Sequence, residues 1–509
     1  MIHLLVSALL AVGLLATDSQ PASTLPAGIV TSTPAPPADF ASLKSQLRDK
    51  DDRKRREAVK GLIELDTEEA WELVIDALAD PVAQVADEAQ IGLSELPEGL
   101  HKDLFGKRGL ASKKEIVALR VAEVLGRMHV TFSDKEYAKA LGHKDAEVRR
   151  SALWSLERLA KRGMLNSPSK DLLKQLNKLL RKDKQDAVQA QALVTIAALD
   201  ESAVETLVLE FAFAKSPLIR AAAMELTRGL PAFGLIQVQT LVVNDPAFAV
   251  RLIAYESANA QGSLAAMRFL VEALGKEQRA RCAWRIVDFL RGSTGMKYGL
   301  DPRPWSDWLS QQPEGWTAQE KKERQAAGEE GTTALVGMRV ISSYLTFLID
   351  FSGSMWKETA GVSLKQKVDV EMRKALEGLA PEVMFNVQPY ATDSVLWEKK
   401  LTPASERNVK QAMDFFEGCK LTGKGDFWSA MQIAMLDPEV DTFMLLGDGA
   451  PTGGQRWNME LMKSLFAHEN RFRRIALDAL LMDCSGFLTS QWEVMCEQSG
   501  GRCMSVEIQ

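Results

Sequence analysis

An aspartate and two serines directly follow an apolar stretch in the second half of the chain. Asp350, Ser352 and Ser354 lie in the sequence LTFLIDFSGSM of Leu345–Met355. Such an apolar run is typical of a buried parallel strand, and open parallel sheets bind ligands at the carboxyl ends of their strands. One carboxylate and two hydroxyls there are hard oxygen ligands, which suit Mg²⁺, Ca²⁺ or Mn²⁺. A helix N-cap is the alternative, and the spacing favours the metal interpretation.

The same pattern returns about a hundred residues later. Asp448 ends the apolar sequence TFMLLG of Thr442–Gly447 and is followed by Gly449. Two carboxylates at strand ends can bind one ion if their strands are neighbours in the sheet. The pair therefore predicts one metal site built by two separate loops.

With both motifs in place, Gly337–Gln509 resembles the von Willebrand factor type A domain with its metal-ion-dependent adhesion site. The resemblance implies a doubly wound α/β, Rossmann-like fold with right-handed crossovers. Strand and helix patterns alternate as this fold requires. The expected helices are 364–379, 408–416, 428–435 and 491–498, and the further expected strands are 382–391, 475–482 and 502–508.

The third loop of the expected site departs from the family pattern. Alignment to the family places Gly425 where a threonine normally completes the metal shell. Asp426, or Thr422 through a shifted loop, must then supply that ligand. A third carboxylate would strengthen ion binding and weaken the pull of the ion on an acidic partner. Gly447 also stands where a small hydroxyl residue is common in the family.

The region before this domain is helical by pattern and repeats. Its units carry an Asp-containing turn, charged residues and an Ala-rich helix, and they resemble short HEAT repeats of an α-solenoid. A non-repetitive helical bundle is the alternative. The central alanines are separated by 31, 33, 30, 40, 31 and 31 residues, at Ala58, Ala89, Ala122, Ala152, Ala192, Ala223 and Ala254.

The charge balance and the motifs of the sequence limit the possible functions. The chain has 62 Lys and Arg against 68 Asp and Glu, and its basic stretch, 101–185, is interleaved with acids and poor in aromatic residues. That composition disfavours nucleic acid. None of the five histidines falls in the metal loops, and no nucleophile or phosphate-binding motif stands out. We therefore expect no enzyme activity, although a metal-dependent hydrolase with Asp426 as base stays open.

The termini and linkers give the domain plan. An apolar run at Ile2–Thr17 is too short to span a membrane and suits a signal peptide, although an uncleaved N-terminal anchor is the alternative, and no later segment is long and apolar enough to cross. The plan is a signal peptide at 1–19, a Pro/Ala/Ser/Thr linker at 20–39, HEAT-like repeats at 40–291, a connector and hinge at 292–335 and the A domain at 336–509. A disulfide within Cys484, Cys496 and Cys503 would fit an oxidising compartment.

These expectations describe an exported binding or scaffold protein, whether periplasmic, at the cell surface or secreted. Its A domain would hold Mg²⁺ or Ca²⁺ and, through the ion, an acidic side chain of a protein partner. The solenoid would supply a surface for a second protein. A regulatory subunit of an ATPase assembly is the alternative from another class.

Overall fold

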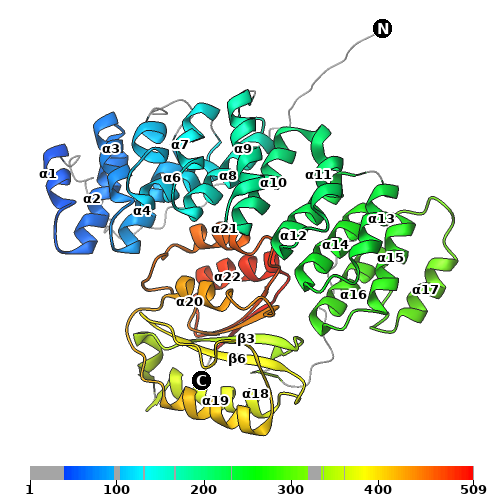
Figure 1. Cartoon of the computed structure of the whole chain (residues 1–509). Coiled ribbons are helices and arrows are strands. Elements are labelled where there is room, and N and C mark those ends of the chain that lie inside the picture. Colours follow the sequence, from blue (N-terminus) through cyan, green and yellow to red (C-terminus); the bar gives the residue numbers. More distant parts are fainter. Residues whose placement is uncertain are drawn as a thin grey trace, which may run out of the picture. The chain divides into compact units, whose positions relative to one another are not determined.

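The first part of the computed structural model consists of helices that pack in two rows (Figure 1). The structure describes residues 39–96, 104–129, 132–165, 168–230, 232–318, 334–335, 338–359 and 361–507. The predicted signal peptide, the linker up to residue 38 and the charged hinge at 319–333 lie outside these ranges. The helices are α1 (Phe40–Gln46), α2 (Asp52–Leu65), α3 (Glu68–Ala77), α4 (Ala83–Ser94), α6 (Glu115–Arg127), α7 (Ala138–Leu141), α8 (Ala146–Lys161), α9 (Lys170–Lys182), α10 (Asp186–Leu199), α11 (Val204–Phe211), α12 (Pro217–Leu226), α13 (Ala232–Val242), α14 (Phe248–Gln261), α15 (Leu264–Leu274), α16 (Ala280–Thr294) and α17 (Pro302–Ser310).

The even-numbered helices from α2 to α16 form one row, in which each packs on the next. Small residues allow this close approach. Each of the seven alanines that mark the repeat in the sequence is fully buried. The periodic alanines therefore lie where neighbouring helices meet.

A recurring arginine joins consecutive helical units. It donates from Nη1 to two backbone carbonyls of the turn before its own helix, and it pairs with an acid in a later turn. Each pair is largely shielded from water, so it fixes the position of one unit on another more firmly than an exposed ion pair would. The pairs are Arg55–Asp80, Arg149–Asp183, Arg220–Asp245 and Arg251–Glu277.

The C-terminal part is an α/β domain around a mixed sheet of six strands in the order β10-β9-β8-β3-β6-β7. All pairings are parallel except that of β6 with the short β7. The main elements are β3 (Tyr344–Asp350), α18 (Leu364–Glu377), β6 (Met384–Tyr390), β7 (Thr402–Pro403), α19 (Glu406–Gly418), α20 (Phe427–Ala434), β8 (Thr442–Gly447), α21 (Met459–Glu469), β9 (Ala476–Met482), α22 (Gly486–Ser499) and β10 (Cys503–Val506). Two-residue strands pair as β1 (Ala334–Leu335) with β2 (Met338–Arg339) and β4 (Glu358–Thr359) with β5 (Val362–Ser363).

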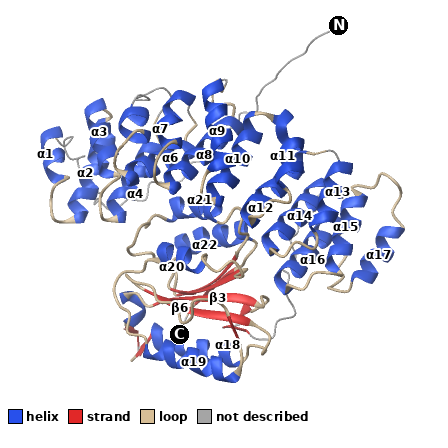
Figure 2. Cartoon of the chain, viewed as in Figure 1, coloured by secondary structure: helices blue, strands red, loops and turns tan. Residues whose placement is uncertain are grey.

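Helices cover both faces of this sheet. Helices α18 and α19 lie on one face, and α20, α21 and α22 lie on the other (Figure 2). The apolar core under α20–α22 continues into the last helices of the first part, so Phe248 and Trp284 share one cluster with Phe443 and Trp492. The helical part and the α/β domain are therefore joined by a common core.

The connector tryptophans and three cysteines have defined surroundings. Trp305 of α17 is fully buried, α17 packs on α15, and the ring of Trp308 meets that of Trp316 with centroids 5.7 Å apart. Cys484, Cys496 and Cys503 are all free thiols in this structure. Among the described residues no helix combines the length and apolar character that a membrane crossing requires.

Candidate metal site

The two aspartates that the sequence singles out end neighbouring strands. β3 and β8 are parallel and adjacent, and Ile349 pairs with Leu446. Asp350 therefore lies beside Gly447, and Asp448 follows one residue later at the same edge of the sheet. The hydroxyl oxygens of Ser352 and Ser354 are 3.1 Å apart in the loop after β3. Two carboxylates and two hydroxyls thus gather at one edge.

Asp350 is a buried carboxyl group, 3% exposed. Burial raises its pKa to about 7, the nearby charge of Asp448 adds to the rise, and hydrogen bonds from Ser352 oppose it. The backbone N–H of Ser352 donates to Asp350 Oδ1 at 2.6 Å. A cation beside this carboxyl would favour its charged form, because it would replace the solvation lost on burial.

Gly425 and Gly447, the two glycines beside the expected metal ligands, have different surroundings. A Cβ on Gly447 would lie 2.7 Å from Asp350 Cβ, which is too close for any side chain without a shift. A Cβ on Gly425 would lie 3.5 Å from Asp350 Oδ2 and 3.6 Å from Ser352 Oγ, which is ordinary contact. Gly447 is therefore required by close packing, whereas Gly425 leaves room at the mouth of the site.

Asp426 is the N-cap of α20. Its Oδ1 accepts from the backbone N–H of Ser429 at 3.0 Å and its Oδ2 from the Ser429 hydroxyl at 2.6 Å. Burial raises the pKa of Asp426, while these hydrogen bonds and one from the backbone of Gln455 oppose the rise. Its carboxylate therefore already has donors away from Asp350. Thr422, the other candidate for this loop, is exposed.

Sequence reasoning missed Thr452, a hydroxyl residue in the loop after Asp448. Its Oγ1 accepts from the backbone N–H of Gly425 at 2.7 Å, and its own N–H donates to the Gly425 carbonyl. Thr452 thus ties the loop after Asp448 to the loop that contains Gly425. The sequence did contain a signal for this role, a threonine four residues after Asp448, but only the loop around Gly425 was searched for a hydroxyl residue.

The donor set fits a hard divalent cation. Asp350 and Asp448 would supply charge, and Ser352 and Ser354 would supply hydroxyl oxygens, which are the ligand types that Mg²⁺ and Ca²⁺ take. In the described ranges no three His, Cys, Asp or Glu side chains come together in a way that could hold an ion. Any ion at this edge must therefore rely on hydroxyls and water beside the two carboxylates.

The loop that follows Asp448 is held by the helical part of the chain. Asp87 of α4 accepts from the backbone N–H groups of Trp457 and Asn458 at 2.6 and 2.9 Å. It also pairs with Arg120 of α6 at 2.7 Å, and Arg120 donates to the carbonyl of Gln455. Asp87 is wholly buried, so it links the start of α21 to the helical row.

Arginines on the α/β side meet acids from successive helices along the rest of this interface. Arg456 pairs with Glu123 of α6 at 2.6 Å. Arg471 bridges Glu157 of α8 and Glu225 of α12. Burial alone would raise the pKa of Glu225, but the charge and hydrogen bond of Arg471, together with the charges of Arg474 and Lys161, lower it to about 2.

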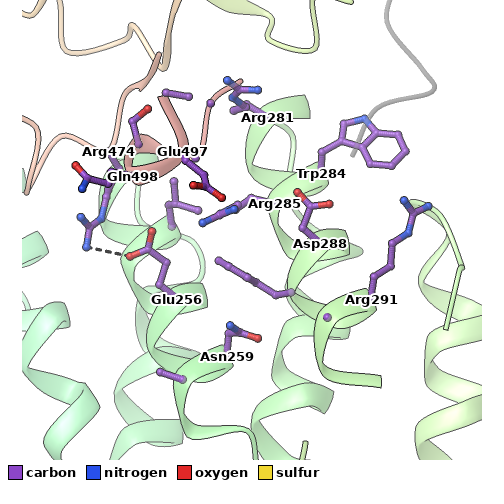
Figure 3. A pocket seen from close by; sticks show the side chains of 18 of the residues that line it. Glu256, Asn259, Arg281, Trp284, Arg285, Asp288, Arg291, Arg474, Glu497 and Gln498 are labelled. Atoms are coloured by element: carbon purple, nitrogen blue, oxygen red, sulfur yellow. Dashed lines mark ion pairs between the residues drawn. The ribbon is translucent and has the colours of Figure 1, made fainter. Parts of the chain in front are cut away.

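The far end of the interface surrounds a cavity of about 1420 Å³. Figure 3 shows acidic and basic side chains interleaved around it, with Arg474 paired to Glu256 at 2.9 Å. Arg281 and Arg285 lie there with Asp288 and Glu497. The wall carries five arginines and three acids, and two of the arginines, Arg281 and Arg502, pair with Asp478.

Comparisons with known proteins give short sequence matches. No protein-family profile matches the chain. It is 33% identical over 131 residues to inter-alpha-trypsin inhibitor heavy chain H4 of Homo sapiens, which covers 23% of this chain and 14% of that protein. The Bos taurus protein of the same name is 29% identical over 140 residues, covering 25% and 15%. The chain thus matches a small part of these relatives.

The solved structures found by comparison resemble this chain only weakly. The YibA protein of Escherichia coli is 17% identical, covers 50% of this chain and 93% of its own, and has a TM-score of 0.31. The CpcE–CpcF complex of phycocyanin lyase from Nostoc is 17% identical, covers 56% of this chain and 99% of that chain, and has a TM-score of 0.24.

Proposed function

We propose that this protein is an exported, non-enzymatic binding protein whose α/β domain is of von Willebrand A type. Asp350, Ser352, Ser354 and Asp448 would hold one Mg²⁺ or Ca²⁺ ion, and the ion would take an oxygen from an acidic side chain of a partner protein. The supporting observation is that Asp350 ends β3 and Asp448 directly follows the adjacent parallel strand β8, with two hydroxyls in the loop after β3. The short match to inter-alpha-trypsin inhibitor heavy chains agrees with a protein-binding role.

The role of each residue follows from its chemistry. Asp350 and Asp448 would balance the charge of the cation, and the serine hydroxyls would coordinate it without adding charge. Two carboxylates formally balance the charge of a divalent ion, so the site would carry no excess negative charge to repel a carboxylate from outside, and a coordination position that the protein leaves open could accept its oxygen. Asp426 would act by capping α20 and holding the third loop, and Thr452 would join that loop to the second.

We further propose that the helical part is a HEAT-like solenoid. Support comes from the unbroken row of even-numbered helices, the buried periodic alanines and the recurring arginine. The even-numbered row contacts the α/β domain, so a second protein partner would use the other row. Leu209 on α11 and Leu241 on α13, each 64% exposed, give that row apolar surface.

The experiment is capture of partners by the full-length protein from its native compartment. We expect at least one protein to be retained with Mg²⁺ or Ca²⁺ and released by a chelator, and Asp350→Asn should abolish its retention. The matched control is Asp301→Asn, which changes the exposed N-cap residue of α17, and this variant should still retain the partner. The same proteins bound with and without chelator would contradict the ion-dependent mechanism.

A further inference from the structure

His468 is a buried histidine on the face of α21 that meets the helical part. It is 5% exposed, and its ring stacks on Trp154 of α8 with centroids 4.8 Å apart. Both ring nitrogens are shielded from water and have no hydrogen-bond partner. These surroundings therefore favour the neutral form of the imidazole, which packs on Trp154 as an apolar ring would.

The charged groups around the ring oppose its protonation. Arg150 and Arg158 of α8 and Arg471 after α21 are the cations that act on it. The acids nearby are already paired, because Glu469 binds Arg150 and Glu157 binds Arg471. Burial, followed by these three arginines, keeps the pKa of His468 well below its usual value. A protonated ring would thus lack both water and a counter-ion.

We propose that the contact between α21 and the helical part is a pH-sensitive joint that His468 opens on acidification. When α21 separates from α8, the ring meets water and regains an ordinary pKa near 6.5. The open form then binds more protons than the closed form below that pH. Closure is therefore fully favoured above about pH 7 and weakens as the pH falls through 6.5.

The size of the effect follows from one titrating group. With an open-state pKa near 6.5 and negligible protonation when closed, the opening equilibrium rises about tenfold between pH 7.5 and 5.5. Glu225, an acid of the same interface, titrates at a lower pH than the histidine. The pKa of Glu225 is lowered to about 2, so its contribution is present above about pH 4.5 and is lost only below that pH.

Hydrogen–deuterium exchange on the full chain tests the joint. After correction for intrinsic rates, amides of α21 and α8 should exchange about tenfold faster at pH 5.5 than at pH 7.5. His468→Phe keeps a ring on Trp154 and should abolish the faster exchange at pH 5.5. The control His129→Gln, which changes an exposed histidine, should still show the faster exchange. Equal acceleration in His468→Phe, or in β3 as well as α21, would overturn the proposal.

A second measurement is made on the wild-type protein, and a variant serves only to assign the resonance. In the wild-type protein, NMR of the histidine ring carbons should show one resonance that does not titrate down to pH 5.5 in the closed form. We expect it to vanish in His468→Gln. A resonance of His468 that titrates near pH 6.5 without faster exchange of α21 would show that the ring is hydrated when closed, and it would overturn the proposal.

Discussion

At the scale of single residues, the site is a buried carboxyl group surrounded by small residues. Asp350 is held by Ser352 and crowded by Gly447, so neither the aspartate nor the glycine tolerates a change of size. The space beside Gly425 is the exception. The residue types that follow the strands predicted the candidate oxygen donors. The crowding at Gly447 was not predictable, because it depends on how closely β8 approaches β3, and a local sequence pattern does not reveal that distance.

The two glycines give a matched pair of substitutions. Gly425→Thr should be accommodated and should raise Mg²⁺ affinity, because its hydroxyl can reach the space beside Asp350 Oδ2. Gly447→Thr should destabilise the fold by about 1–3 kcal/mol through overpacking against Asp350. Denaturant unfolding and calorimetry separate the two results. Loss of stability in Gly425→Thr equal to that in Gly447→Thr would show that the third loop is packed differently.

Asp350→Asn tests the cost of the buried charge. Ionising a carboxyl whose pKa is raised to about 7 destabilises the fold as the pH rises from about 4 to 7. Without divalent ions at pH 8, the amide should therefore be more stable than the wild type by about 2–4 kcal/mol. Equal or lower stability, measured by urea unfolding in chelator, would contradict this cost and would mean that another group compensates the buried charge of Asp350 in the ion-free protein.

Asp426→Asn tests whether the Asp426 side chain acts as a helix cap or as a metal ligand. Asn caps a helix about as well as Asp, so the variant should keep both the stability of α20 and the ion affinity. Asp426→Ala should lose about 1 kcal/mol of stability. A large drop in ion affinity for Asp426→Asn would instead restore the sequence-based view that this carboxylate is a ligand.

At the scale of elements, the alternation of strands and helices in the α/β part could be predicted from the sequence. The expected strand 382–391 is β6 at Met384–Tyr390, and the expected helix 408–416 is α19 at Glu406–Gly418. Hydrophobic period and chain order sufficed there. The cap role of Asp426 was missed because Asp426 had been assigned to the metal shell. No helix was expected at α21 (Met459–Glu469).

The element that ties the site to the helical part is the segment from Thr452 to α21. Asp87→Ala should destabilise the protein by about 3–5 kcal/mol, because Arg120 would lose its buried partner and two backbone N–H groups their acceptor. Glu57→Ala, at an exposed residue of α2, is the control and should change stability by less than about 0.5 kcal/mol. Similar unfolding midpoints for the two variants would contradict the importance of this contact.

At the scale of the whole molecule, the main feature that the sequence did not predict is the interface. The interface joins Arg456, Arg471 and Arg474, in the segments that flank α21, to acids on α4 to α14. In the sequence these charged residues look like ordinary solvated charges. Only the folded chain brings them together, over distances of more than two hundred residues in sequence. The even-numbered row therefore faces the α/β domain of the same chain.

The central claim is that the edge formed by β3 and β8 binds one divalent cation. Isothermal titration calorimetry of Mg²⁺ and Ca²⁺ into chelator-treated full-length protein tests it most directly. We predict one ion per chain in the wild type, retained binding in Asp426→Asn, and no binding in Asp448→Asn, whose fold should be unchanged by circular dichroism. Equal affinity in the wild type and Asp448→Asn, or no binding by the wild type at millimolar ion, would contradict the account.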